Sequence, residues 1–249
     1  MITRAAAVWT VLGVVILAGI DEWIGRSQVF GDSWPPLSTV LRQYGSETTR
    51  SSLSYAFEAT IPAALKGLVL GMVIGVLLAG AGSLLLILED GLASAAAAVH
   101  AIPIIVVAPV LVSTTDRSDI PMYLAALSSL FVAYVSVERG LHSSRPAHED
   151  VFTALGAGQV RRLLHLRALA AIPLTLEGLR LAFTASMLGA VLGEWFGSPR
   201  GVGVLLVSSM QSGDSVLLWT AALTTSLITL VGYGVILVAE VPARRRFLG

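Results

Sequence analysis

The chain has 249 residues, of which 55% are hydrophobic and only 13% are charged, with a formal net charge of zero. A soluble domain carries roughly 25% charged residues, so this composition indicates a protein whose solvent is lipid. The absence of cysteine excludes disulfide frameworks, thiolate metal sites and cysteine nucleophiles, and the dispersed basic residues offer no footprint for nucleic acid.

Six apolar segments are long enough to cross a bilayer, which takes roughly 20 helical residues. Within lipid only a helix satisfies its backbone groups inside one segment, so the chain is predicted to be an all-α polytopic membrane protein with one domain, 1–249. The first segment could also be part of a signal peptide, but Asp21 and Glu22 follow it instead of a small-residue cleavage site, so we expect it to be retained. In chain order the predicted spans are 5–20, 67–88, 91–115, 120–137, 168–193 and 216–239.

The segment 21–62 is long for a plain connection. Its Trp34-Pro35-Pro36 run requires a non-helical turn, because proline lacks the N–H that a helix interior needs. Apolar residues then recur at helical spacing over 37–44. This pattern predicts a short amphipathic helix lying on the membrane surface.

Orientation follows from the basic residues, because loops rich in Lys and Arg stay in the cytoplasm. With a cytoplasmic N-terminus, nine basic residues fall on the inner side and five on the outer side. Both termini are therefore expected in the cytoplasm. Segment 21–62 becomes an extracytoplasmic loop, and segment 139–167 becomes the longest cytoplasmic loop.

That cytoplasmic loop is predicted to hold two short helices, 149–155 and 159–169, with a hinge at Gly156-Ala157-Gly158. Glycine adopts the positive φ that a sharp turn between helices often requires, and Glu149 and Asp150 suit a helix N-terminus. The second helix sets arginines among leucines, as expected at the lipid headgroups. An ordinary surface loop with a capping glycine is the alternative interpretation.

The loop resembles the EAA signature of the inner-membrane permeases of binding-protein-dependent ABC importers: E-A-A, three residues, G, nine residues, I-x-L-P. With Gly156 as the signature glycine, E-A-A falls on Asp150-Val151-Phe152 and I-x-L-P on Leu166-Arg167-Ala168-Leu169. The acid is one carbon shorter, larger apolar residues replace the alanines, and the proline is missing, although Ile172-Pro173 follows. The resemblance implies that this loop is the coupling helix that docks on the ATPase, with these residues: Glu149, Asp150, Thr153, Ala154, Gly156, Ala157 and Gly158.

A second stretch, 178–203, resembles permeases of the nitrate, sulfonate and taurine subfamily. It contains Gly178-Leu179-Arg180, Glu194-Trp195-Phe196-Gly197 and Gly201-Val202-Gly203, and the third predicted span adds Ala101-Ile102-Pro103 and Ala108-Pro109. The resemblance implies a type I ABC importer permease fold, with its core at about 64–245. It thins over 113–141, where the W-F-G and F-P motifs of the subfamily are replaced. The substrate stays open among nitrate-, sulfonate- or taurine-like anions and vitamin precursors.

The predicted spans also contain candidates for the translocation path. Small residues recur at three- and four-residue spacing from Gly178 to Gly193, which permits close packing within the chain or against a second permease. Prolines should bend the third span, which can open a cavity or merely shape packing. The candidates for the path or its gate are Pro103, Pro109, Ser186, Glu194 and Phe196.

Ionisable groups at membrane depth are costly and call for partners. Glu177 and Arg180 lie three residues apart and are expected to pair along one helical face. Glu194 is either interfacial or part of an outer gate. His100 is expected to be a buried, hydrogen-bonded imidazole rather than a ligand.

The predicted function is that of a permease subunit with about six transmembrane helices, which forms the translocation path of an ATP-driven importer for a small solute. The chain has neither a G-x-x-x-x-G-K-[ST] loop nor an H-E-x-x-H motif, so it is not expected to be an enzyme or to hold a metal or cofactor. ATP and Mg²⁺ are expected on a partner ATPase.

Its expected partners are cytoplasmic ABC ATPases, a second permease chain, like or unlike, and an extracytoplasmic solute-binding protein, in the bacterial cytoplasmic membrane. The alternative is a secondary transporter or channel not driven by ATP. Such a protein is expected to place ionisable groups near the bilayer centre or to show repeated halves with broken helices.

Overall fold

The computed structural model describes the backbone of residues 4–248 and the side chains of residues 8–85 and 87–241. The described chain is helical throughout, with no strand. The helices are α1 (Arg4–Ser27), η1 (Gly31–Ser33), α2 (Leu37–Gln43), α3 (Glu47–Leu84), α4 (Leu86–Ala101), α5 (Ile104–Thr114), α6 (Ile120–Leu141), α7 (Pro146–Ala154), α8 (Gln159–Arg162), the π-helical turn η2 (Leu163–Arg167), α9 (Ala168–Glu194), α10 (Val202–Ser212) and α11 (Ser215–Leu248).

Among the described residues, five helices are long and apolar enough to cross a membrane: α1, α3, α6, the run from α8 to α9, and α11. The third predicted span, 91–115, differs from expectation. It is divided into α4 and α5, which meet at an angle of 88°. The cause is Pro103, since the residue before a proline is pushed out of the helical region, and Ile102 is extended with φ −71° and ψ 120°. The sequence predicted a bend here, but the helix is broken.

Several predicted boundaries were wrong, among them the end of the first span, since α1 continues to Ser27, and the start of the loop helix, since α7 begins at Pro146. Helix α3 begins at Glu47 rather than at 67, because Ser46 caps it by accepting a hydrogen bond from the Thr49 N–H, and the helix then continues through Pro62. It ends at Leu84, before the position predicted for the end of the second span. The predicted surface helix 159–169 is not separate, because α8, η2 and α9 form one run of 36 residues.

Helix α6 lies between α3 and α9 and makes close contact with both. Three glycines four residues apart on α3 let the two backbones meet: a Cβ at Gly75 would lie 2.7 Å from the Ala133 Cβ, and Gly67 and Gly71 face α6 in the same way. On the other side, a Cβ at Gly193 of α9 would lie 2.6 Å from the Pro121 Cα. Helices in lipid have no hydrophobic force to bring them together, so their association depends on the close packing that these small residues permit.

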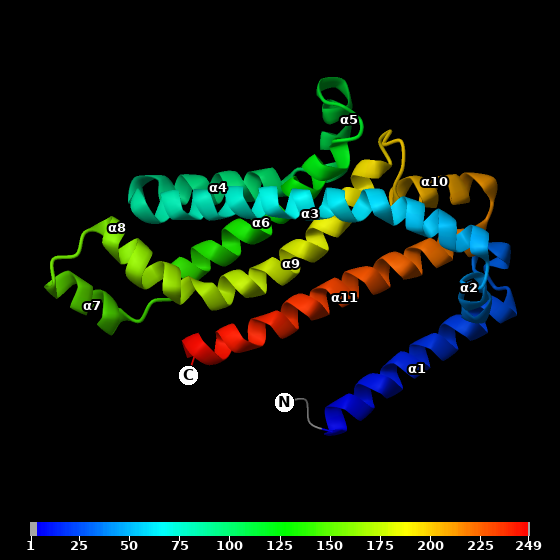
Figure 1. Ribbon diagram of the computed structural model, residues 1–249, viewed down its shortest axis with the longest axis horizontal. Coiled ribbons are helices and arrows are strands. Elements are labelled where there is room, and N and C mark those ends of the chain that lie inside the picture. The colour runs from blue at the N-terminus through cyan, green and yellow to red at the C-terminus, as the bar shows by residue number, and fades with distance from the viewer. Residues whose placement is uncertain (1–3, 249) are drawn as a thin grey trace.

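Figure 1 shows the long helices running roughly along one direction, with α7 and α8 at one end and α2 and α10 at the other. Helix α11 ends toward the α7 end, whereas α1 begins near the middle of the molecule's length. Helix α2 lies where the short surface helix was expected, at the far end from α7. Its contact with a membrane surface stays a prediction.

Candidate functional site

The hinge after α7 is a Schellman turn. Gly156 has φ +68°, its N–H bonds the Thr153 carbonyl, and the Ala157 N–H bonds the Phe152 carbonyl. This pair of bonds satisfies carbonyls that would otherwise be left over at the helix end, and it favours glycine at the left-handed position. The positive φ predicted for the hinge is confirmed at Gly156. Gly158 instead has φ −68° and begins α8.

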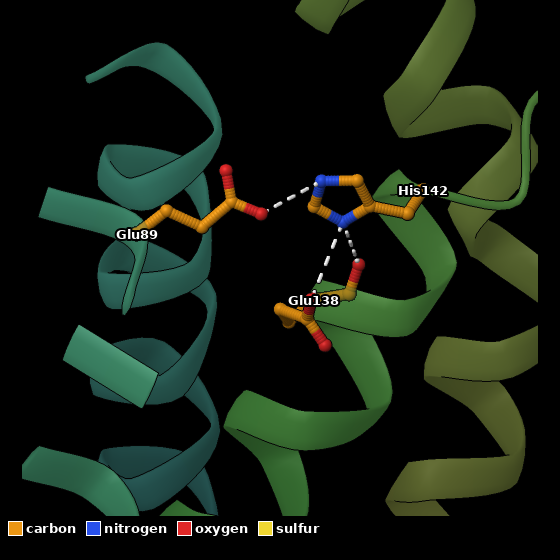
Figure 2. Close-up of side chains that lie close together, drawn as sticks. All are labelled: Glu89, Glu138 and His142. Atoms are coloured by element: carbon orange, nitrogen blue, oxygen red, sulfur yellow. Dashed lines mark hydrogen bonds and ion pairs between the residues drawn. The ribbon is translucent and has the colours of Figure 1, made fainter. Parts of the chain in front are cut away.

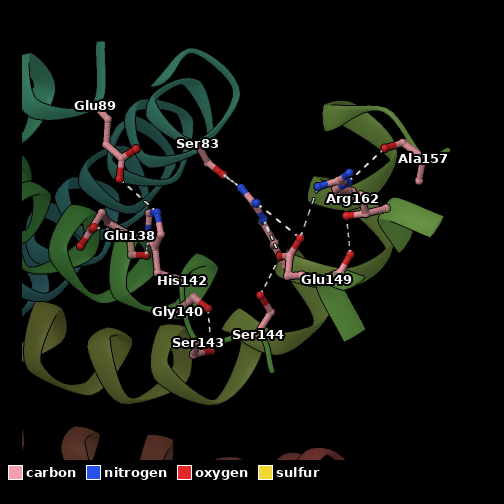
Figure 3. Close-up of polar contacts among 12 residues, drawn as sticks. Ser83, Glu89, Glu138, Gly140, His142, Ser143, Ser144, Glu149, Ala157 and Arg162 are labelled. Atoms are coloured by element: carbon pink, nitrogen blue, oxygen red, sulfur yellow. Dashed lines mark hydrogen bonds and ion pairs between the residues drawn. The ribbon is translucent and has the colours of Figure 1, made fainter. Parts of the chain in front are cut away.

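Glu149 braces α7 against the helix that leads into the membrane. Its carboxylate accepts hydrogen bonds from the Arg167 Nε at 2.8 Å and the Ser144 hydroxyl at 2.7 Å, and the Arg162 Nη1 lies 3.9 Å away (Figure 3). Arg167 also donates to the Ser83 hydroxyl of α3 at 3.3 Å. The hydrogen bond from Arg167 holds the pKa of Glu149 below its ordinary value, against the opposing effect of partial burial.

The outer face of α7 carries exposed apolar side chains. Val151 is 55% exposed, Leu155, which caps the end of α7, is 76% exposed, and Val160 of α8 is 58% exposed. Of the predicted coupling residues, Glu149 faces inward to its arginines and Ala157 is buried. The others are exposed: Asp150, Thr153, Ala154, Gly156 and Gly158.

A second polar cluster fixes the end of α6, from which the loop departs. The His142 Nε2 lies 3.0 Å from the Glu89 carboxylate of α4, and the His142 Nδ1 contacts the Glu138 carbonyl at 2.9 Å (Figure 2). One ligand atom from each of Glu89, Glu138 and His142 lies within 4.8 Å of the others, a donor set that could hold a divalent cation. The spacing of Glu138 and His142 is visible in the sequence, but the approach of Glu89 is not.

Two hollows lie along α9. The larger, about 800 Å³, is lined by α9 and α11, and the smaller, about 280 Å³, lies at the break between α4 and α5. Ala185 and Leu188 line both, so the hollows adjoin across α9. Among the side chains that the structure describes, no charged residue lines either hollow. Their polar lining residues are Thr184, Thr225, Ser226, Thr229 and Tyr233 in the larger hollow and His100 and Ser128 in the smaller.

The predicted path residues are distributed unevenly around these hollows. Pro103 lines the smaller hollow, whereas Pro109 is exposed within α5. Ser186 is fully buried, donates to the Phe183 carbonyl and lines neither hollow. Phe196 packs against the buried cluster of Ala108, Ile120 and Leu124. Whether any of them meets a substrate stays a prediction.

Glu194 lies in a packed node at the outer end of α9, only 1% exposed. Its carboxylate accepts hydrogen bonds from the Thr60 hydroxyl and the Gly203 N–H, both at 2.6 Å, and Thr60 in turn accepts from the Val202 N–H at 2.9 Å. An acid that meets free N–H groups at a helix start is stabilised there. Gly201, with φ +142°, leaves no room for a Cβ against the Glu194 carboxylate. Glu194, with Thr60 and the two glycines Gly201 and Gly203, therefore joins α9, α3 and α10.

The second intramembrane charge has a partner that was not predicted. The Arg180 Nε lies 3.0 Å from a carboxylate oxygen of Glu240 in α11, and the guanidinium lies over the Tyr233 ring. The predicted pairing with Glu177 is looser, at 4.0 Å. Arg180 and Glu240 are both buried, so this ion pair ties α9 to α11.

Comparison with known proteins agrees with this architecture. Residues 67–240 match the family described as binding-protein-dependent transport system inner membrane component. The formylaminopyrimidine transport permease protein ThiX of Halalkalibacterium halodurans is 27% identical over 206 residues, covering 81% of this chain and 80% of ThiX. The riboflavin transport system permease protein RibX of Chloroflexus aurantiacus is 30% identical over 154 residues, covering 59% of this chain and 55% of RibX.

A probable ABC transporter permease protein of Haemophilus influenzae is 31% identical over 138 residues, which cover 54% of this chain and 55% of that protein. The family match spans well over half of the chain and includes the α7 loop, both hollows and Glu194. The resemblance stated from the EAA loop is confirmed, and with it the multi-pass helical fold. The chain belongs to the binding-protein-dependent transport system inner membrane components, the membrane-spanning permeases of ABC importers.

Proposed function

We infer that this chain is one of two permease subunits whose facing surfaces form the translocation path of an ATP-driven importer for a small, uncharged nitrogen heterocycle. The observation that carries this function is the brace from α7 to α9. Helix α7 has an exposed apolar face and is held through Glu149 to Arg167. Arg167 lies on the helix that continues along both hollows. Movement of α7 is thereby passed to the path.

The exposed apolar residues of α7 are the docking surface for the partner ATPase. Leu155 and Val151 are largely exposed, and a solvated helix face gains little by carrying them. Burial of one such side chain in a groove contributes about 1.5–3 kcal/mol. ATP and Mg²⁺ bind the ATPase, and this chain supplies no catalytic group or cofactor.

The lining of the hollows favours heterocycles over small anions. Nitrate, sulfonates and taurine carry an anionic group that a path through a low-dielectric region would match with Arg or Lys. None of the described residues that line the two hollows is charged. The printed names of two relatives, a formylaminopyrimidine permease and a riboflavin permease, refer to flat nitrogen heterocycles. The Ser and Thr hydroxyls of α9 and α11 suit such ligands as uncharged acceptors, since their protons are donated to backbone carbonyls of the same helices.

The complete importer contains a second permease, like or unlike this one, two ATPases and an extracytoplasmic binding protein. The basic-residue bias places both termini and α7 in the cytoplasm of a bacterial cell and α2 and α10 outside. Gly189 and Gly193, two of the small residues that recur from Gly178 to Gly193, pack against α6. These two residues therefore serve packing within the chain. The second permease therefore contacts other surfaces of the chain.

The test is the association of the ATPase. Leu155→Asp should abolish co-purification of the ATPase with the permease, while the permease still inserts, because the side chain is exposed. Val29→Asp is the matched control, since Val29 is similarly exposed and lies in the turn between α1 and η1, far from α7 in the sequence. Equal ATPase recovery with the two variants would reject the docking surface.

A further inference from the structure

His100 differs from the other ionisable groups at membrane depth. Its ring stacks on Phe131 with centroids 4.1 Å apart and planes 9° from parallel, yet the side chain is exposed and, within the described residues, neither ring nitrogen has a hydrogen-bond partner. The expectation of a buried, hydrogen-bonded imidazole was therefore wrong. Arg180 and Glu194, by contrast, are buried with partners. An unsatisfied imidazole among membrane-spanning helices is costly unless a ligand completes it.

The position of His100 is also unusual. It ends α4 just before the break at Pro103, and in Figure 1 the end of α4 lies near the middle of the length of α3. Both half-helices line the 280 Å³ hollow there, together with Ser128 of α6. Broken helices within membranes are tolerated where they line a cavity, and such breaks are frequent binding sites. The hollow adjoins the larger one along α9, so a ligand at His100 would already lie in the path.

The ligand that fits this position is flat, neutral and rich in hydrogen-bonding edges. Phe131 covers one face of the imidazole and fixes its plane, which leaves the other face and the nitrogens for a ligand. A neutral imidazole both donates and accepts, matching a ring N and an exocyclic N–H. Stacking between flat rings adds selectivity for aromatic ligands.

We propose that His100, braced by Phe131, is a substrate-contacting residue at the helix break that binds an edge of a neutral nitrogen heterocycle as it crosses the membrane. The proposal rests on the proposed function, since the heterocycle class comes from there. The residues that line the hollow add to that function which side chain contacts the substrate and what that side chain does. Ser128 contributes less, because its hydroxyl proton is committed to the Leu124 carbonyl at 2.8 Å.

The experiment uses the complete importer in vesicles, with uptake of riboflavin or a formylaminopyrimidine and ATP hydrolysis measured together. His100→Phe keeps the flat ring but removes both nitrogens, and Val106→Ala is the control, exposed on α5 without lining the hollow. Losing one hydrogen bond should lower the amount of heterocycle transported per ATP about fivefold in His100→Phe, with receptor-stimulated hydrolysis retained. The control should match the wild type.

Each other outcome has a distinct meaning. If the wild type carries taurine or nitrate but no heterocycle, the proposed substrate class fails. If the wild type carries a heterocycle and His100→Phe carries it equally well per ATP, only the His100 subsite is overturned. Loss of the second permease from His100→Phe complexes, but not from Val106→Ala complexes, would also overturn it, by showing that the partner chain occupies the hollow.

Discussion

The brace between α7 and α9 depends on one carboxylate, so Glu149→Gln is its most direct test. The change keeps the shape but removes the charge that accepts the 2.8 Å hydrogen bond from Arg167 and attracts Arg162. Hydrogen bonds to charged groups contribute about 1.5–3 kcal/mol, and exposed ion pairs only about 0.2–1 kcal/mol. Because the Glu149 and Arg167 side chains are 22% and 18% exposed, we expect a loss of about 1–2 kcal/mol. The detached fraction of α7 should rise roughly five- to thirtyfold.

The assay is ligand-stimulated ATP hydrolysis and uptake in vesicles that contain the complete importer. Both rates should fall severalfold in Glu149→Gln, while the complex still assembles through the exposed face of α7. Arg167→Gln should have a similar effect, and the double variant should be no worse than either, because the two residues share one contact. Additive losses in the double variant would refute the brace.

The same brace predicts an acid dependence. The pKa of Glu149 in the folded protein lies below its ordinary value of 4.5, because Arg167 and Ser144 hydrogen-bond the charged form. The stabilisation is therefore fully present above pH 4.5 and is lost as the pH falls through the lower folded value. Uptake and stimulated ATP hydrolysis by the wild type should stay constant from neutral pH down to about 5 and fall below that range. In Glu149→Gln, which has no carboxylate to protonate at this position, that fall should be absent. A brace that weakened between pH 7 and 6 would contradict this assignment.

The remaining predictions concern the turn, the helix contact and the assembly. Gly156→Val forces a β-branched residue into φ +68°, at a cost of about 1–2 kcal/mol, and should lower uptake and stimulated hydrolysis without preventing insertion; unchanged transport would remove the coupling role. Gly71→Leu should lower the thermal stability of the purified complex, because the close approach of α3 to Ser129 of α6 leaves no space for a side chain. A reporter after Arg145 should read cytoplasmic and one near Gly45 external, and the reverse would overturn the topology. Native mass spectrometry should find two permease chains with two ATPases, and a different permease beside one copy of this chain would identify an unlike pair.

The spans could be predicted from the sequence because lipid imposes a length and a composition on each one, but their ends could not all be placed. Pro62 was taken as a boundary, although a proline inside a membrane helix is tolerated when neighbouring groups replace its lost bond. The true start of α3 does carry a local signal, since Ser46 followed by Glu47 is a capping pattern. At Pro103 the error was the reverse. A bend was predicted, but the helix breaks there, because Ile102 before the proline is extended.

Residues of the candidate site could be predicted from the sequence where they interact with residues close in the chain. They were missed where their partners are distant in the chain. The Gly156 turn and the acidic start of α7 follow from short-range rules. No spacing rule connects Glu149 to Arg167, 18 residues later, or Arg180 to Glu240 on another helix. Those pairs depend on how the helices pack, and the packing depends on the glycines of α3, whose four-residue spacing is visible but whose partner helix is not.

The continuity of α8, η2 and α9 changes how coupling is understood. A separate surface helix at 159–169 would move with the loop and leave the membrane helix in place, whereas one continuous helix transmits a displacement along its length. The π-helical turn, in which the Ala168 N–H bonds the Leu163 carbonyl, lies where Arg167 meets Glu149, and such turns are frequent at functional positions because the helix is locally wider. Beyond it, α9 lines both hollows with Ala185 and Leu188 and ends at the Glu194 node. If α7 docks on the ATPase as we propose, a force applied there reaches the hollows through this one continuous helix, whose far end is held at the Glu194 node. We therefore expect rotation of α9 about that node, more than bending of the loop, to open the path.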